Sequence, residues 1–247
     1  MYDLLKAKNQ WLKPELVRFA RELIEVPSLS LAEKDAATVV ERWMREAGFD
    51  QVLRDDCGNV VGVLLGREAG PTLVLNSHLD TVSADGKGWR RSPFKACLEG
   101  GRLYGLGSAD CKGGLAAQVF TAILLKRCLL PLQGNLVVAA TAAEENGLSL
   151  GVRGLLEKTL PSLGLKPAYA ILGEPTDLGL YYGHDGWLEL EITVEGEDLF
   201  EVDDAARAIY REFAARTGEG GGPQSVEHLA TDYLNQSLDQ GFRATIG

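Results

Sequence analysis

Residues 73–82 read LVLNSHLDTV, an apolar run that leads into a histidine and an aspartate. A short apolar run of this kind is typical of a strand that is buried on both faces of a sheet. His78 and Asp80 follow at its carboxyl end, which is where open α/β sheets place their ligands. The stretch therefore predicts an α/β fold with a functional site at this edge of the sheet.

The same pattern continues on both sides of this stretch. Apolar runs predict further strands, and amphipathic periodicity predicts helices. The expected strands cover residues 51–54, 59–65, 72–76, 135–141 and 169–172, the helices cover 12–23, 36–47 and 112–127, and a glycine-rich hairpin covers 98–105. Pro14 suits a first helical turn, and Pro27 ends that helix. We therefore expect a three-layer αβα sandwich with a mixed, largely parallel sheet.

Composition and charge exclude several classes of protein. The chain of 247 residues is 45% hydrophobic, enough for a sizeable core, and its 25 basic and 35 acidic side chains give a net charge of −10. A nonspecific grip on nucleic acid or on a membrane surface is therefore not expected. No apolar run is long enough to span a membrane, and the N-terminus lacks the apolar core of a signal peptide. Four cysteines without CxxC spacing favour a reducing compartment, so we expect a cytoplasmic protein.

The first candidate site residues lie just beyond the strand expected at 72–76 and in a later glycine-rich turn. His78 can offer a neutral imidazole to a metal ion, and Asp80 can hold that ring in place. Asp110 lies in a glycine-rich turn that opens the helix expected at 112–127.

Two further acidic groups follow the later strands. Glu144 and Glu145 are adjacent, so one can act as a base while the other binds a metal ion, and Glu174 stands before a proline. Each group alone has an ordinary explanation, because HxD pairs often cap helices and acidic residues near glycine or proline often make turns. All the groups together, in this order and after successive strands, favour a shared site.

Five blocks of sequence resemble one known family. They are SHLDTV (77–82), GWRRSPF (88–94), GGRLYGLGSADCKGGLAA (100–117), AAEENG (142–147) and ILGEPTD (171–177). They resemble the signature blocks of the zinc-dependent aminoacylase and carboxypeptidase metallohydrolases, which include acetylornithine deacetylase and succinyl-diaminopimelate desuccinylase. The resemblance runs from about residue 28 to 194, and Cys111 stands where the family often has methionine.

The resemblance implies a zinc-exopeptidase-like fold and a role for each candidate residue. His78 and Glu174 would bind the first metal, Asp110 would bridge both metals, and Asp80 would support the histidine. The remaining two roles are those of Glu144, the general base, and Glu145, the ligand of the second metal.

The implied reaction is hydrolysis of the amide bond in an N-acyl amino acid or a small peptide by metal-activated water. The implied cofactor is zinc at two sites, the second of them weak, with cobalt or manganese as substitutes.

The resemblance is incomplete toward the C-terminus. The family's second metal also receives a histidine from a C-terminal block, and neither His184 nor His228 has that context. We expect a catalytic domain over 1–183, a remnant of the crossover into a lid or dimerisation domain over 184–202, and C-terminal helices that pack on the catalytic domain over 203–247. The lid would then be truncated or absent. A homodimer remains an alternative, but it would not have the family's complete lid interface.

Two alternatives follow from the missing histidine. The chain could be a degenerate, non-catalytic remnant that binds one metal or a partner protein, or a subunit that receives its missing ligands from another chain. The zinc content of each chain distinguishes them, because two metals indicate the enzyme, whereas one or none indicates the remnant.

Overall fold

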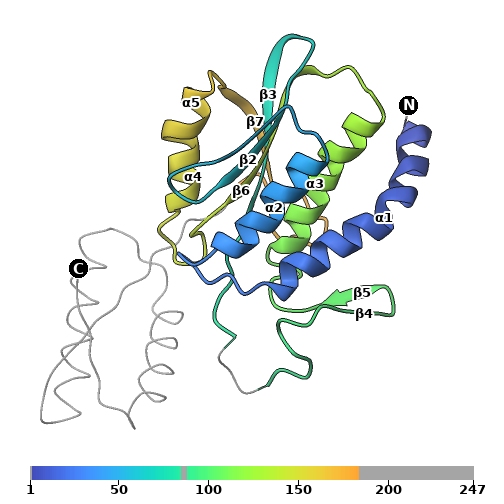
Figure 1. The fold of residues 1–247 in the computed structure, drawn as a ribbon, viewed down its shortest axis with the longest axis vertical. Coiled ribbons are helices and arrows are strands. Elements are labelled where there is room, and N and C mark those ends of the chain that lie inside the picture. The colour runs from blue at the N-terminus through green and yellow to red at the C-terminus, as the bar shows by residue number, and fades with distance from the viewer. Residues whose placement is uncertain (1, 85–87, 184–247) are drawn as a thin grey trace, which may run out of the picture. The chain divides into compact units, whose positions relative to one another are not determined.

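The computed structural model describes residues 2–84 and 88–183 (Figure 1). The predicted crossover segment 184–202 and the predicted helices of 203–247 lie outside these residues, and so do His184 and His228. The expected domain boundaries, truncated lid and homodimer therefore stay predictions.

The centre of the structure is a mixed five-stranded sheet. Its strands, in sheet order, are β1 (Gln51–Arg54), β2 (Val60–Leu64), β6 (Gln133–Thr141), β3 (Glu68–His78) and β7 (Pro167–Leu172). The β6–β3 and β3–β7 pairs are parallel, and the β1–β2 and β2–β6 pairs are antiparallel. Within this sheet two of the four pairings are therefore parallel, and both involve β3, the strand that carries His78.

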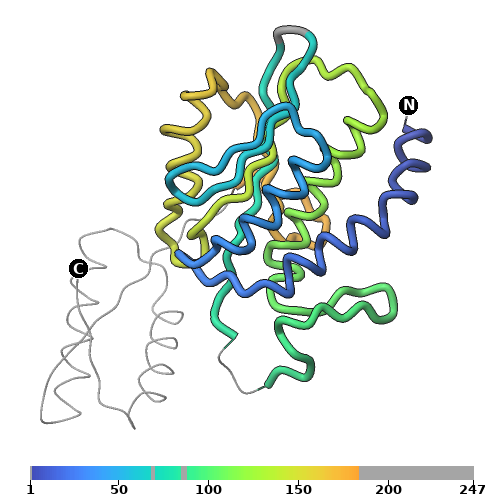
Figure 2. Tube along the Cα trace, in the orientation of Figure 1, coloured from blue at the N-terminus to red at the C-terminus, as the bar shows by residue number. Residues whose placement is uncertain are grey.

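Helices cover both faces of this sheet, as the ribbon and the tube both show (Figures 1 and 2). One face carries α1 (Tyr2–Glu25), α2 (Lys34–Glu46) and α3 (Lys112–Arg127), and the other carries α4 (Leu150–Gly154), a π-helical turn η1 (Leu155–Thr159) and α5 (Leu160–Ser162). A separate hairpin pairs β4 (Cys97–Glu99) with β5 (Arg102–Tyr104). No helix within the described ranges is long and apolar enough to cross a membrane.

Successive side chains of the central strands enter two different cores. In β2, Val60 and Leu64 pack in the core beneath α1, α2 and α3, whereas Val61 and Val63 pack with Leu155 on the opposite face. All five are almost completely buried. Because neighbouring side chains of a strand point to opposite faces, burial of both sets requires a helical layer on each side. The predicted three-layer α/β sandwich is confirmed.

Two local features differ from the prediction. Helix α1 begins at Tyr2 rather than near residue 12, so Pro14 lies inside the helix instead of in its first turn. The helical turns before residue 12 are largely exposed, so they have no apolar periodicity from which a helix could be predicted. The short helices over residues 150–162 were not predicted, because each is too brief for a periodic pattern.

The parallel register brings the ends of three strands together. His78 at the end of β3 pairs with Thr141 at the end of β6, and Leu172 of β7 pairs with Asn76 of β3. The chain therefore leaves β3, β6 and β7 at the same edge of the sheet. The residues that follow these three strands become neighbours, although they are far apart in the sequence.

The core beneath α1, α2 and α3 contains a cluster of three aromatic rings, which a substitution can test. The ring centroids of Phe19, Trp43 and Phe120 lie between 5.2 and 5.9 Å apart, beneath α1, α2 and α3. We expect Phe120→Ala to lower the free energy of unfolding by about 3–5 kcal/mol in urea titrations, because it leaves a cavity in this cluster. Trp11→Ala is the control, because it removes a ring that is 83% exposed. It should change the free energy of unfolding by no more than about 0.5 kcal/mol. Equal losses in both variants would contradict this core.

Candidate metal centre

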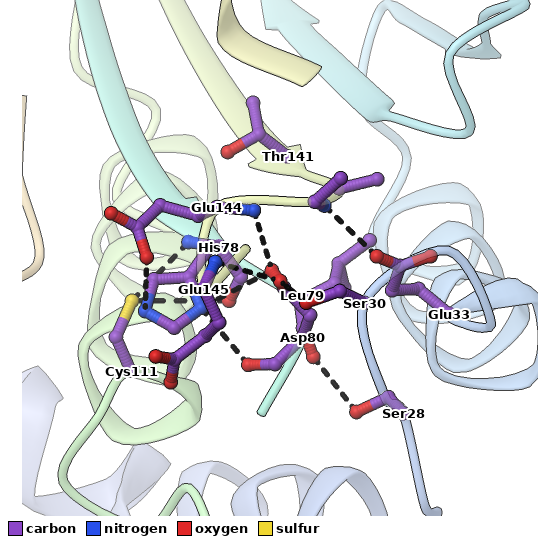
Figure 3. A network of polar contacts seen from close by, with 12 residues as sticks. Ser28, Ser30, Glu33, His78, Leu79, Asp80, Cys111, Thr141, Glu144 and Glu145 are labelled. Carbon is purple, nitrogen blue, oxygen red and sulfur yellow. Dashed lines mark hydrogen bonds and ion pairs between the residues drawn. The ribbon is translucent and has the colours of Figure 1, made fainter. Parts of the chain in front are cut away.

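His78, at the end of β3, makes hydrogen bonds through both ring nitrogens. Figure 3 shows it beside Asp80, Cys111 and Glu144. Its Nδ1 lies 2.9 Å from the main-chain oxygen of Asp80, and its Nε2 lies 2.9 Å from Oδ1 of Asp110. Because a carbonyl oxygen only accepts, Nδ1 carries a proton, and Nε2 is the nitrogen that faces the carboxylates. This is the orientation in which a buried histidine presents Nε2 to a metal.

Three carboxylates gather around that nitrogen. Besides Asp110, one oxygen of Glu144 and one oxygen of Glu174 each lie 4.0 Å from Nε2 of His78. All three side chains are about half exposed, whereas the imidazole is almost fully buried. The histidine therefore forms the floor of the site, and the carboxylates form a rim that solvent reaches.

The sulfur of Cys111 completes a four-residue cluster. One ligand atom from each of His78, Asp110, Cys111 and Glu174 lies within 4.8 Å of the other three. The sulfur also accepts a hydrogen bond from the main-chain N–H of His78 at 3.2 Å. The sequence marked Cys111 only as a replacement for methionine, and its contact with His78 could not be read from spacing.

The charges of this cluster are unbalanced without a cation. Burial raises the pKa of the Glu174 carboxyl, His78 opposes that rise, and Asp110 and Glu144 add to it. Burial likewise raises the pKa of Glu145, again with opposition from His78 and repulsion from the other carboxylates. Crowded carboxylates of this kind are typical of a site that holds a cation.

The pKa of His78 depends on the acidic groups that surround its ring. Burial works against the charged ring, but hydrogen bonds and charges from Asp80, Cys111 and Asp110 outweigh it and raise the pKa of His78 to about 12. Nε2 is the ring nitrogen that faces the rim, and a metal ion bound there would compete with a proton for this nitrogen.

Asp80 links the histidine to the Glu144–Glu145 turn. Its Oδ1 accepts the main-chain N–H of Glu144 at 3.2 Å, and its Oδ2 accepts the N–H of Glu145 at 2.9 Å and the hydroxyl of Ser30 at 2.7 Å. Burial raises the pKa of Asp80, but these bonds and His78 lower it to about 2. Asp80 is thus a fixed anion suited to holding other groups in place rather than to exchanging protons.

Two glycines allow the segment that carries Glu174 to approach α3 and β3 closely. A Cβ on Gly114, in the first turn of α3, would overlap the main-chain oxygen of Gly173. A Cβ on Gly173 would in turn overlap the hydroxyl of Ser77 in β3. Main chain therefore lies directly against main chain here, and this contact sets the position of Glu174 beside Asp110.

The structure thus places every predicted site residue at one edge of the sheet. Sequence reasoning missed the polar residues that support them, above all Ser30 and Glu33 in the link between α1 and α2. Their partners lie 50 and 110 residues away along the chain, so no local spacing could reveal them.

The glycine contact predicts a specific loss of metal affinity. Gly114→Ala should push Gly173 away and displace Glu174, weakening the tighter metal site by about tenfold or more in calorimetric titrations. Gly183→Ala is the control, because a Cβ there meets no atom within 4 Å. Gly62→Ala would crowd the core beneath α2, so it controls for lost stability alone. If Gly114→Ala binds metal as tightly as Gly183→Ala, the contact does not position Glu174.

The sequence matches Peptidase family M20/M25/M40 over residues 74–233, well over half of the chain. The acetylornithine deacetylase of Shigella sonnei (strain Ss046) is 34% identical over 203 residues, which are 78% of this chain and 51% of that protein. The uncharacterized protein YgeY of Escherichia coli K12 is 30% identical over 197 residues, or 79% of this chain and 47% of YgeY. This chain spans about half the length of the curated relatives it matches.

Solved structures show the same fold. Human carnosine dipeptidase 1 superposes with a TM-score of 0.62 at 18% identity, over 79% of this chain and 44% of that one. The M20 family metallo-carboxypeptidase Sso-CP2 of Sulfolobus solfataricus superposes with a TM-score of 0.54 at 25% identity, over 64% of this chain and 36% of that one. The family match over residues 74–233 shows that the chain belongs to the M20/M25/M40 peptidase family.

Proposed function

We propose that this chain carries the centre of a metal-dependent hydrolase that cleaves the amide bond of an N-acyl amino acid or a small peptide. The observation that carries the proposal is the gathering of three half-exposed carboxylates around Nε2 of the buried His78. Relatives named as a deacetylase and a metallo-carboxypeptidase support linear amides as the substrate class.

The donor set fits zinc. Imidazole nitrogen and carboxylate oxygen are ordinary zinc ligands, and three protein ligands with one open position are the usual complement of a catalytic site. His78, Asp110 and Glu174 would hold the first ion, and Asp110 with Glu145 would hold the second. Bound ions of this kind lower the pKa of a water molecule and polarise a carbonyl group, and cobalt or manganese would serve in place of zinc.

Glu144 would move the proton in this reaction. Its carboxylate is half exposed at the rim, with one oxygen 4.0 Å from Nε2 of His78, and its main chain is held by Asp80. It would accept a proton from the attacking water and deliver it to the leaving nitrogen. Asp80 would keep both the imidazole and the Glu144 turn in position during these steps.

The second metal would have the poorer set of ligands. Within residues 2–84 and 88–183, His78 is the only histidine, so Glu145 and the bridging Asp110 offer that ion no imidazole. The same observation favours the alternative of a non-catalytic remnant that holds a single metal. Metal content and activity must therefore be measured on the same preparation.

Metal titration separates these two candidates. We expect one metal to survive dialysis and a second to bind about ten- to a hundredfold more weakly, because it lacks one ligand. Hydrolysis of N-acyl amino acids should be weak and should rise with added zinc or cobalt. Calorimetry and metal analysis after dialysis measure the first result, and amine release measures the second. A single metal without activity at any zinc concentration would favour the remnant, whereas two equally tight metals would show that another residue supplies the ligand, with His184 and His228 the first to examine.

Two neighbouring substitutions separate the base from the ligand. Glu144→Gln should lower turnover by about 10²–10⁴-fold with both metals retained, because an amide cannot accept the proton of water. Glu145→Ala should weaken the second metal by about ten- to a hundredfold and leave the first unchanged. Calorimetry and turnover at saturating zinc measure both effects. Equal metal loss in the two variants would mean that the roles of the pair are wrongly assigned.

A further inference from the structure

The link between α1 and α2 lies against the candidate metal centre (Figure 3). The hydroxyl of Ser28 donates to the main-chain oxygen of Leu79 at 2.8 Å, and the N–H of Thr81 donates to the main-chain oxygen of Ser28 at 2.8 Å. Leu29 forms an isolated parallel bridge with Thr81. The segment of residues 28–33 thus runs beside the chain that carries His78 and Asp80.

Glu33, at the end of this segment, reaches the turn that carries the glutamate pair. Its Oε1 accepts the main-chain N–H of Ala143 at 2.9 Å and also that of Leu31 at 2.9 Å. Glu33 and Ala143 are both buried, with exposed fractions of 6% and 1%. Without Glu33, the buried N–H of Ala143 would lose this acceptor, and a buried N–H without an acceptor destabilises the fold.

The main chain of Ala143 is itself in an unusual conformation. Its φ of +55° lies in the left-handed region, which residues other than glycine rarely adopt. Such a conformation persists only where the surroundings enforce it. The hydrogen bond that Ala143 donates to Glu33 therefore restrains the residue whose backbone sets the direction of the chain into Glu144.

Two buried carboxylates divide the three consecutive N–H groups of this turn. Glu33 accepts from Ala143, and Asp80 accepts from Glu144 and Glu145. Ser30, in the same segment as Glu33, donates to Asp80 at 2.7 Å. Residues 28–33 therefore act on the turn along two routes, one direct and one through Asp80.

Burial of the Glu33 carboxylate is unfavourable unless polar partners offset the loss of water. A carboxylate taken out of water is expensive unless it is paired or hydrogen-bonded. Glu33 takes part in none of the ion pairs found among the described residues. Its compensation comes from main-chain N–H groups, one of which belongs to the turn before the base.

We propose that Glu33 is a positioning residue that fixes the Glu144–Glu145 turn, and with it the base and the ligand of the second metal. The role in turnover rests on the proposed hydrolase function, whereas the role in holding the turn and the second metal does not require that the chain be active. The bond to Ala143 needs an acceptor oxygen at Oε1 rather than a negative charge.

Three variants of the full chain test this role. Glu33→Ala removes the acceptor, and Glu33→Gln keeps an oxygen in the same place without the charge. Glu22→Ala is the matched control, because Glu22 accepts hydrogen bonds from Trp43 and Arg42 away from the metal centre. Its loss should lower stability without moving the turn. Thermal unfolding shows that each variant is folded at the assay temperature.

The first readout needs neither metal nor activity. Amide hydrogen exchange of Ala143, followed by NMR, should become at least tenfold faster in Glu33→Ala and stay near the wild-type rate in Glu33→Gln and Glu22→Ala. The second readout is calorimetric titration with zinc, in which Glu33→Ala should weaken the second metal by about tenfold or more and leave the first unchanged.

The third readout is hydrolysis of N-acyl amino acids at saturating zinc. Glu33→Ala should lower kcat by about ten- to a hundredfold with little change in KM, and Glu33→Gln should restore most of it. If Glu33→Ala matches Glu22→Ala in exchange and in metal affinity, or if Glu33→Gln is as impaired as Glu33→Ala, the positioning role is wrong. If the wild-type chain is inactive, the hydrolase proposal fails, and the exchange and metal measurements still decide the role of Glu33.

Discussion

The candidate centre depends on the hydrogen bonds that the buried Asp80 accepts. Its two oxygens receive the main-chain N–H groups of Glu144 and Glu145 and the hydroxyl of Ser30, and its main-chain oxygen receives Nδ1–H of His78. These bonds hold the pKa of Asp80 near 2, below its value in the unfolded chain. The resulting stabilisation is complete above the unfolded pKa and is lost as the pH falls toward 2.

A second buried charged group, Lys112, lies two residues after Asp110. Its ammonium donates to the main-chain oxygens of Leu23 and Val26, each at 2.8 Å, where α1 ends. Burial lowers the pKa of Lys112 to about 8. A cation at the C-terminal end of a helix meets carbonyl groups that have no partner within the helix. The start of α3, which follows Asp110, is thereby tied to the end of α1.

Much of this arrangement could be predicted from local sequence, and the remainder could not. The apolar run before His78, the glycine-rich turn at Asp110 and the periodicity of α3 are local signals, and each predicted the element that is present. The short helices of residues 150–162 gave no periodic signal, and Pro14 suggested a helix start where the helix in fact continues. The role of Glu33 depends on a contact across 110 residues, which only the folded register reveals.

The parallel register of β3 and β6 also has consequences for how the protein acquires its centre. A side chain in β3 meets its partner in β6 across 63 residues of intervening sequence, and the turn beyond β6 meets Glu33 across 110. Contacts of such long range form slowly, because closing a long loop costs conformational entropy before the contact contributes any stabilisation. In the unfolded chain the candidate ligands are scattered, so a divalent ion would bind the native state in preference. Such an ion would act as a folding ligand, raising the midpoint of unfolding with its free concentration.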